Sequence, residues 1–258
     1  MYIVSGSKDK TIKVWDASDF ACVKTLTGHG DAVKSVSTFT DSKTDKVYIV
    51  SGSYDTTVKV WDASNGTCVK SLTGHSDYVR SVSTFTDAKT DKVYIVSGGS
   101  AADSTIKIWD ASNQTCVKTL TGHSYGVRSA STFTDAKTDK VYIVSSGDDN
   151  TIKVWDASDG TCVKTLTGHS DVVTSVSIFP DLNRKQKEKA LYNELLEYIS
   201  KDVINHFVLP YAIPPTFNIV SGSWDETVRI WPVSAAVSTS QVQPAGQKRR
   251  KLNNSNTF

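Results

Sequence analysis

The chain has 258 residues, of which 38% are hydrophobic, 9% aromatic and 22% charged, a composition typical of a soluble globular protein with a sizeable core. Twenty-nine Lys and Arg against 27 Asp and Glu give a net charge of +2, which argues against a dedicated nucleic-acid or membrane-surface protein. The chain has no run of 18 apolar residues and no basic, apolar leader at its start, so we expect an intracellular protein without a transmembrane helix.

A repeat of 46 to 48 residues organises most of the chain. Trp15, Trp61, Trp109 and Trp155 are separated by 46, 48 and 46 residues, and Trp231 follows after one further period plus an insertion of 30. Gly-His pairs recur with the same period and end at His29, His75, His123 and His169. Such periods are typical of repeat architectures, in which neighbouring units bury each other's faces.

Each period is predicted to contain four short strands. In the unit that follows His75 they cover residues 78–85, 93–97, 105–109 and 115–120, which are rich in Val, Ile, Thr and aromatic residues and bounded by turn residues. Four antiparallel strands cannot bury both faces of their own sheet, and radial stacking of such units makes a propeller. We therefore predict an all-β protein, a β-propeller of about five four-stranded blades with incomplete first and last blades.

The repeated residues resemble a known family. Gly-His, then Ser-Gly-Ser-x-Asp, then Ile-Lys-Val-Trp-Asp are similar to the WD-repeat (β-transducin-like) family over about residues 2–179 and 217–232. The resemblance implies that each repeat supplies three strands of one blade and the outer strand of the preceding blade. It also implies a non-catalytic protein-interaction scaffold within a multiprotein complex. We expect no enzymatic activity, no cofactor and no metal.

Four repeats carry a His, a Ser and an Asp, with the Asp six residues before the Trp. The sets are His29, Ser51, Asp55, Trp61; His75, Ser97, Asp103, Trp109; His123, Ser145, Asp149, Trp155; and His169, Ser221, Asp225, Trp231. Nucleophilic catalysis needs one such triad beside an oxyanion hole, whereas four copies at matching spacing indicate a structural task. The family resemblance implies a hydrogen-bonded chain that ties strands together.

Two repeats depart from this pattern. In one, Asp148 and Asp149 are both candidates for the acidic member, and the six-residue spacing to Trp155 favours Asp149. The first unit has Ser5, Asp9 and Trp15 but no preceding Gly-His pair, so we expect its chain and its first strand to be incomplete.

Positions that differ between similar repeats are the candidates for partner recognition. In the resembled family such residues lie on the narrow top face, at the start of the innermost strand and just before the turn Asp. The corresponding basic and aromatic residues are Lys8, Lys34, Tyr54, Tyr78, Arg80, Arg128 and Trp224. Arg and aromatic side chains anchor interfaces, and basic charge favours an acidic or phosphorylated peptide. The alternative interpretation is that they are ordinary solvated loop residues.

One cysteine occurs in each of four repeats, at Cys22, Cys68, Cys116 and Cys162. This spacing fits neither a disulfide nor a zinc site, which need sulfurs close together. We expect buried, reduced thiols that serve as small apolar residues.

An insertion at about residues 182–216 interrupts the last blade. Within it, residues 184–207 are predicted to form a helix, because Leu191, Leu195, Ile199 and Val203 recur every four residues. The sequence leaves three interpretations open: a helix folded onto the propeller rim, a docking helix for a partner, or a translated intron or gene-model error.

The predicted organisation is completed by the two C-terminal segments. The propeller covers residues 1–181 and ends with 217–234, and the polar tail 235–258 is expected to be disordered. Its Lys248, Arg249, Arg250 and Lys251 resemble a nuclear-import signal, with a merely solvated tail as the alternative, so nucleus and cytoplasm both stay open. A second function class is a nucleic-acid-associated nuclear factor that uses the basic face and tail.

The repeats fill between four and five periods, whereas propellers have four to eight blades. An open arc would expose a blade face at each end. We therefore expect a partial chain, from a truncated gene model or a split protein, that self-associates through its ring ends or closes imperfectly with five blades.

Overall fold

The computed structural model describes residues 1–135, 138–180 and 216–234. Within these residues 18 strands form five antiparallel sheets, which confirms the all-β prediction of about five blades. The first sheet contains β1 (Tyr2–Gly6), β2 (Ile12–Asp16) and β3 (Cys22–Leu26). The second contains β4 (Val33–Asp41), β5 (Lys46–Ser53), β6 (Val58–Asp62) and β7 (Cys68–Leu72).

The remaining sheets repeat the same arrangement. The third sheet contains β8 (Val79–Asp87), β9 (Lys92–Gly99), β10 (Ile106–Asp110) and β11 (Cys116–Leu120). The fourth contains β12 (Val127–Asp135), β13 (Lys140–Gly147), β14 (Ile152–Asp156) and β15 (Cys162–Leu166), and the fifth β16 (Val173–Pro180), β17 (Thr216–Ser223) and β18 (Val228–Ser234). The four strands predicted after His75 differ from the observed ones by only one or two residues at their ends.

Strand order within a sheet follows chain order, so that β4-β5-β6-β7 pair as successive antiparallel neighbours. The first sheet has the order β1-β2-β3 and lacks a counterpart of β4, whereas the fifth has the order β16-β17-β18 and lacks a counterpart of β7. The described parts of the first and last blades are therefore incomplete at opposite edges of their sheets.

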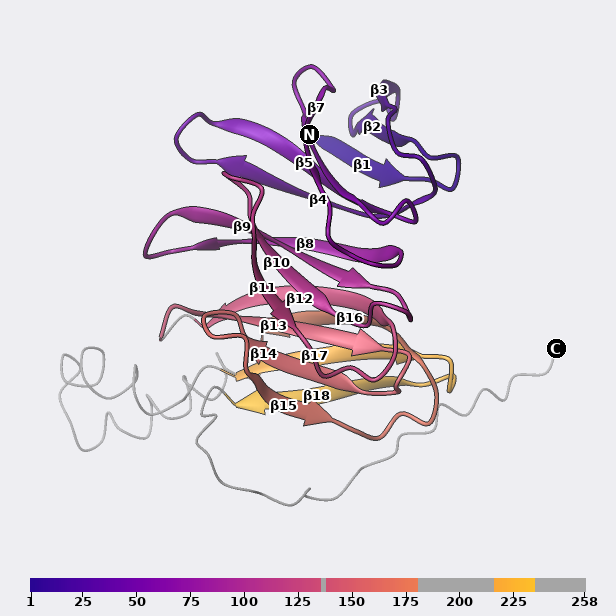
Figure 1. Cartoon of the computed structure of the whole chain (residues 1–258), viewed down its shortest axis with the longest axis vertical. Helices are drawn as coiled ribbons and strands as arrows, with labels where there is room; N and C mark the ends of the chain where they lie inside the picture. The colour runs from indigo at the N-terminus through magenta and orange to yellow at the C-terminus, as the bar shows by residue number, and fades with distance from the viewer. Residues whose placement is uncertain (136–137, 181–215, 235–258) are drawn as a thin grey trace, which may run out of the picture.

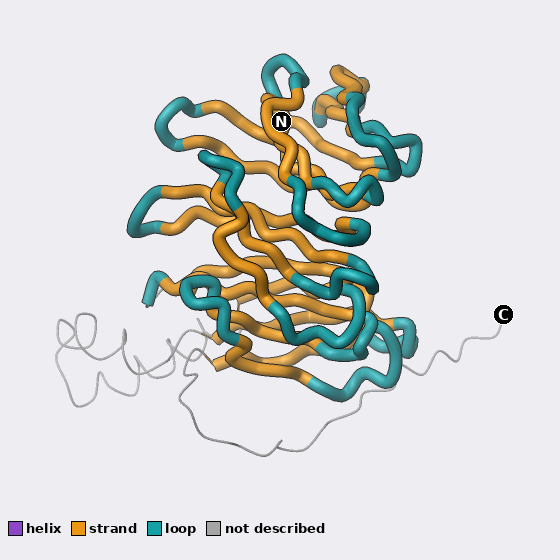
Figure 2. The backbone as a smooth tube through the Cα atoms, in the orientation of Figure 1, coloured by secondary structure: helices purple, strands orange, loops and turns teal. Residues whose placement is uncertain are grey.

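The first and fifth sheets lie at opposite ends of the longest axis, the first beside the second at the top of the view and the fifth beside the fourth at the bottom (Figure 1). Strand β4 contacts β8, β8 contacts β12 and β12 contacts β16, so each sheet packs on its neighbours in the sequence. The strands run across the stack and the turns gather along its two sides (Figure 2). The described blades thus form an open stack.

Because side chains alternate along a strand, each sheet has two apolar faces. We call the face toward the next sheet along the chain the forward face, and the face toward the preceding sheet the backward face. In the second sheet Val58 and Val60 lie on the forward face and contribute to the core shared with the third sheet. Ile49 and Trp61 lie on the backward face and pack with the first sheet. All four side chains are 0–1% exposed.

The cysteines correct a prediction. Cys22, Cys68, Cys116 and Cys162 are exposed and free, not buried. Each begins the outermost strand of its sheet, where only the leucine at the strand end is buried, as the pattern of β3 from Cys22 to Leu26 shows. A thiol at this rim has no neighbouring sheet to cover it.

The insertion and the tail lie outside the described residues. Strand β16 ends at Pro180 and β17 begins at Thr216, so the predicted helix at residues 184–207 falls between them and the predicted import signal falls after β18. The described part of the chain contains no helix that could cross a membrane.

Candidate protein-interaction face

Four buried hydrogen-bonded chains, each made of a histidine, a serine, an aspartate and a tryptophan side chain, lie along one edge of the stack. In each, the histidine Nδ1 lies 2.7–3.1 Å from the aspartate Oδ2 and the Nε2 lies 2.7–2.8 Å from the serine Oγ. The tryptophan Nε1 lies 2.8 Å from the same Oγ. The residues brought together are the four sets that begin with His29, His75, His123 and His169, with Asp149 rather than Asp148 as the acidic member of the third.

The donors and acceptors fix the direction of each chain. The Trp61 indole N–H must donate to the Ser51 Oγ, whose hydroxyl then donates to Nε2 of His29. This leaves Nδ1–H of His29 to donate to Asp55, so the network assigns the neutral Nδ1–H tautomer. Burial lowers the pKa of His29, against the opposing effect of Asp55, and favours the same neutral form.

The aspartates hold the loops that follow each histidine. Asp55 accepts hydrogen bonds from the Gly30 backbone N–H at 2.8 Å and from the Thr57 hydroxyl at 2.7 Å. Burial raises the pKa of Asp55, but hydrogen bonds from Thr57, Gly30 and His29 outweigh it and lower the pKa to about 2. The pKa values of Asp103, Asp149 and Asp225 are lowered by similar hydrogen bonds. All four are carboxylates at neutral pH.

The serines of these chains are inaccessible to a substrate. Ser51, Ser97 and Ser145 are 0% exposed and Ser221 is 1% exposed, and each Oγ is occupied by an imidazole and an indole. The arrangement can fasten a Gly-His loop to the strands beneath it. In the first sheet only the Trp15–Ser5 contact is present, at 2.9 Å, and Asp9 bonds to Thr11 of its own turn.

Backbone hydrogen bonds bring the two sets of variable positions together. The residue before each turn Asp donates to a carbonyl at the start of the innermost strand of the same blade: Tyr54 to Ala32 at 2.9 Å, Asp148 to Gly126 at 2.8 Å, and Trp224 to Val172 at 3.0 Å. In the third sheet Ser100, at the start of a longer turn, donates to Tyr78 at 2.8 Å. We call the edge formed by these loops the top face.

The first group on the top face joins the second and third sheets. The rings of Tyr54 and Tyr78 stack with centroids 4.3 Å apart, and Nζ of Lys34 lies 5.1 Å from the Tyr54 centroid. Tyr78 is 42% exposed. This group therefore presents an aromatic surface with a cation beside it.

The second group joins the third, fourth and fifth sheets. Asp148 lies between two arginines: Arg128 Nε donates to its Oδ1, and NH1 of Arg80 lies 3.5 Å from its Oδ2. The Arg128 guanidinium also lies 5.0 Å from the ring of Trp224, which is 59% exposed. Lys8 is exposed on the turn of the first sheet and belongs to neither group.

Two residues of this face are absent from the predicted binding set. Asp148 is one of the variable positions just before a turn Asp, but only the basic and aromatic positions were selected, yet it links two of them. Tyr125 is 60% exposed and stands where Asp31, Asp77 and Asp171 stand in the other repeats. A comparison of the second residue after each Gly-His histidine would have identified Tyr125 as the exception.

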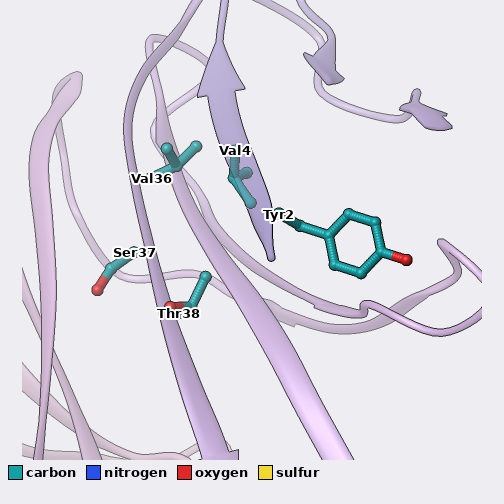
Figure 3. Close-up of a pocket in the computed structure, with 5 residues that line it drawn as sticks. All are labelled: Tyr2, Val4, Val36, Ser37 and Thr38. Atoms are coloured by element: carbon teal, nitrogen blue, oxygen red, sulfur yellow. The ribbon is translucent and has the colours of Figure 1, made fainter. Parts of the chain in front are cut away.

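A hollow at the first sheet offers little chemistry. It is lined by Tyr2 and Val4 on β1 and by Val36, Ser37 and Thr38 on β4 (Figure 3). The first sheet lacks an innermost strand that would lie beside β1, and these side chains of β1 and β4 are therefore left uncovered. The lining is apolar and hydroxylic, so it has no carboxylate, imidazole or amine to serve as a catalytic group.

Comparison with known proteins identifies the family to which the repeats belong. The WD40 family model, described as "WD domain, G-beta repeat", matches residues 1–16, 20–62, 66–110, 114–156, 160–184 and 206–232, more than half of the chain. Such repeats generally form protein-interaction scaffolds and are typically non-catalytic.

Short segments of curated proteins are similar. They include a Lissencephaly-1 homolog from Branchiostoma floridae, 51% identical over 35 residues, 14% of this chain and 9% of that protein. Nuclear distribution protein PAC1 from Mycosarcoma maydis is 40% identical over 43 residues, 17% of this chain and 10% of that protein. Myosin heavy chain kinase C from Dictyostelium discoideum is 56% identical over 34 residues, 13% of this chain and 4% of that protein. These alignments span a tenth of the relatives or less, whereas the repeat match extends across all five blades, and the chain therefore belongs to the WD40 repeat family.

Proposed function

We propose that this chain is an intracellular scaffold that binds an acidic or phosphorylated segment of a protein partner through its top face. The observation that supports the proposal best is the joining of basic and aromatic side chains across blades. Lys34 lies beside the stacked Tyr54 and Tyr78, and Arg128 lies over Trp224. These residue types are the ones that most often anchor protein interfaces.

The charges of the second group suit an acidic ligand. Asp148 neutralises one of the two positive charges of Arg80 and Arg128 and accepts a hydrogen bond from Nε of Arg128. One positive charge remains in excess, and planar guanidinium groups recognise carboxylates and phosphates through paired hydrogen bonds. The exposed Trp224 supplies apolar contact next to that charge.

The experiment is affinity purification of the full chain with mass spectrometry of the retained proteins. Lys34→Glu and Trp224→Ala, both at exposed positions, should each lose a partner that the unchanged chain retains, while thermal unfolding stays the same. A central anchor costs about 2 kcal/mol or more, roughly a thirtyfold loss of affinity. Lys89→Glu is the matched control, because Lys89 is exposed on the loop between β8 and β9, at the opposite ends of those strands. Retention of the same partners by both top-face variants would contradict the proposal.

The alternative function, a nucleic-acid-associated nuclear factor, makes a different prediction. Its affinity for nucleic acid would fall steeply as the salt concentration rises. Replacement of the four basic residues at positions 248–251 by neutral ones would also weaken nucleic-acid binding. The net charge of +2 favours a protein partner. Salt-independent or absent nucleic-acid binding would leave the scaffold as the better assignment.

We also propose that the chain self-associates through the ends of its blade stack. Apolar side chains are exposed at both ends, namely Ile3 in the first sheet and Val228 and Ile230 in the fifth. Exposed apolar patches of this kind mark interaction surfaces. Light scattering on the purified chain should detect assemblies larger than one copy.

A further inference from the structure

The forward face of the fifth sheet is uncovered in the described structure. Val228 and Ile230 on β18 are 73% and 62% exposed. Their counterparts on the forward faces of other sheets are almost fully buried, at 0% and 2% for Ile152 and Val154 in the fourth sheet. The same side-chain pattern thus forms a buried interface between blades in the fourth sheet and an exposed surface in the fifth.

The backward face of the first sheet is the second uncovered surface. Ile3 on β1 is 47% exposed, whereas its counterparts Ile49, Ile95, Ile143 and Ile219 are 0–1% exposed. Trp15 is also only partly buried, while Trp61, Trp109 and Trp155 are 1–2% exposed. Both members of the Ile–Trp pair that forms each internal backward face are therefore available here.

The four internal interfaces define what fits these two surfaces. In each, a pair of β-branched residues from a forward face packs with an isoleucine and a tryptophan from the next backward face. Val58 and Val60 meet Ile95 and Trp109 in this way. Ile152 and Val154 meet Ile219, with Trp231 packed at the edge of the cluster. The partner of an uncovered forward face is thus a backward face, and the chain carries one of each.

We propose that the forward face of the fifth sheet binds the backward face of the first sheet of a second copy of this chain. The inference rests on the proposed self-association and adds its direction. Because the two faces differ in their residues, the contact is heterologous, with each copy using one surface to bind and the other to be bound. Such head-to-tail contacts produce a closed ring when the rotation between copies closes, and an open filament otherwise.

The test is light scattering of the full chain during size-exclusion chromatography, over a wide concentration range. The unchanged chain should associate with increasing concentration. Ile230→Lys removes the forward face, Ile3→Lys removes the backward face, and each alone should stay monomeric where the unchanged chain associates. Val228→Ser is a milder second forward variant, and Val117→Lys, at a 43% exposed position on β11, is the control that should associate normally.

Mixing the two lysine variants provides the decisive measurement. The Ile230→Lys copy still offers its backward face and the Ile3→Lys copy its forward face, so the mixture should form dimers and nothing larger. A monomeric unchanged chain, or assembly that survives both single variants, would overturn the proposal. A mixture that fails to dimerise while each single variant is folded by circular dichroism would overturn it as well. The exposed-site variant Lys34→Glu should assemble normally, so loss of partner binding and loss of assembly are separate results.

Discussion

The ammonium group of Lys24, on the outer strand of the first sheet, donates a 2.7 Å hydrogen bond to the carbonyl oxygen of Ala63 in the second sheet. The same Nζ also reaches the carbonyl of Ser64 at 2.5 Å. Lys70 makes the equivalent bonds to Ala111 and Ser112 one blade further on. These lysines therefore tie the outer strand of one blade to the next blade along the chain.

Replacement of Lys70 by Met should destabilise the chain by about 1–2 kcal/mol, because hydrogen bonds from charged donors contribute more than neutral ones. The change in free energy of unfolding can be measured by urea denaturation. Lys118→Met is the matched control, since Lys118 has the same place on β11 but no hydrogen bond from its Nζ among the described residues. Equal losses in both variants would mean that the lysine stem, not the inter-blade bond, stabilises the rim.

Ser145→Ala should be strongly destabilising, by about 2–4 kcal/mol, because it leaves the Trp155 N–H and the His123 Nε2 buried without a partner. The adjacent Ser146 is equally buried at 0% exposure, but its hydroxyl has no hydrogen-bond partner. Ser146→Ala should accordingly be neutral or slightly stabilising. Thermal melts of the two variants would compare them, and similar melting temperatures would refute a structural role for the Ser145 chain.

Acid should destabilise the blades in two steps. The pKa of Asp55 falls from 3.8 in the unfolded chain to about 2 in the folded one, so its contribution is complete above about pH 4 and is lost as the pH falls toward 2. This shift corresponds to about 2 kcal/mol. The pKa of His29 is also lowered on folding, mainly by burial, so the unfolded state takes up a proton first as the pH drops below 6.5.

The free energy of unfolding should therefore decrease from about pH 7 to about pH 3, as urea titrations at several pH values can measure. The Asp55→Asn variant should be less stable at neutral pH and should lose the part of the decrease below about pH 4 that Asp55 contributes. An unchanged acid profile in that variant would show that Asp55 is not the group responsible.

A left-handed backbone residue in the top turns offers a stabilising substitution. Thr56 has a φ of 68°, a conformation that disfavours β-branched side chains, whereas the equivalent Asn150 has a φ of 62°. Thr56→Asn should raise the free energy of unfolding by about 0.5–1 kcal/mol, and the reverse change, Asn150→Thr, should lower it by a similar amount. Calorimetric melting of both variants checks the prediction. Melting temperatures that shift in the same direction in both variants would contradict it.

The repeat period made most of this fold predictable. A constant spacing of six residues to Trp155 was enough to select Asp149 over Asp148, and the structure places Asp149 in contact with His123 at 2.9 Å. Strand positions followed from apolar alternation between turn residues. These features are local, or repeat often enough for one unit to interpret another.

Features that depend on position within the stack could not be read in this way. Cys22 is apolar and periodic, which indicated a core residue, but burial on an outer strand is decided by whether a neighbouring sheet reaches it. The link from Arg80 through Asp148 to Arg128 joins residues of different blades. Its existence depends on the angle between sheets, for which the sequence of one repeat carries no signal.

Because each sheet packs on its sequence neighbours, the chain should unfold as a linear array rather than as one block. The third sheet has a complete partner on both sides, whereas the first and fifth have one each. Amide protons should therefore exchange fastest in β1 and β18 and slowest in β9 and β10, a gradient that native-state hydrogen exchange would record residue by residue. A mutation of given local severity would then cost the whole chain more in the middle blade than at either end.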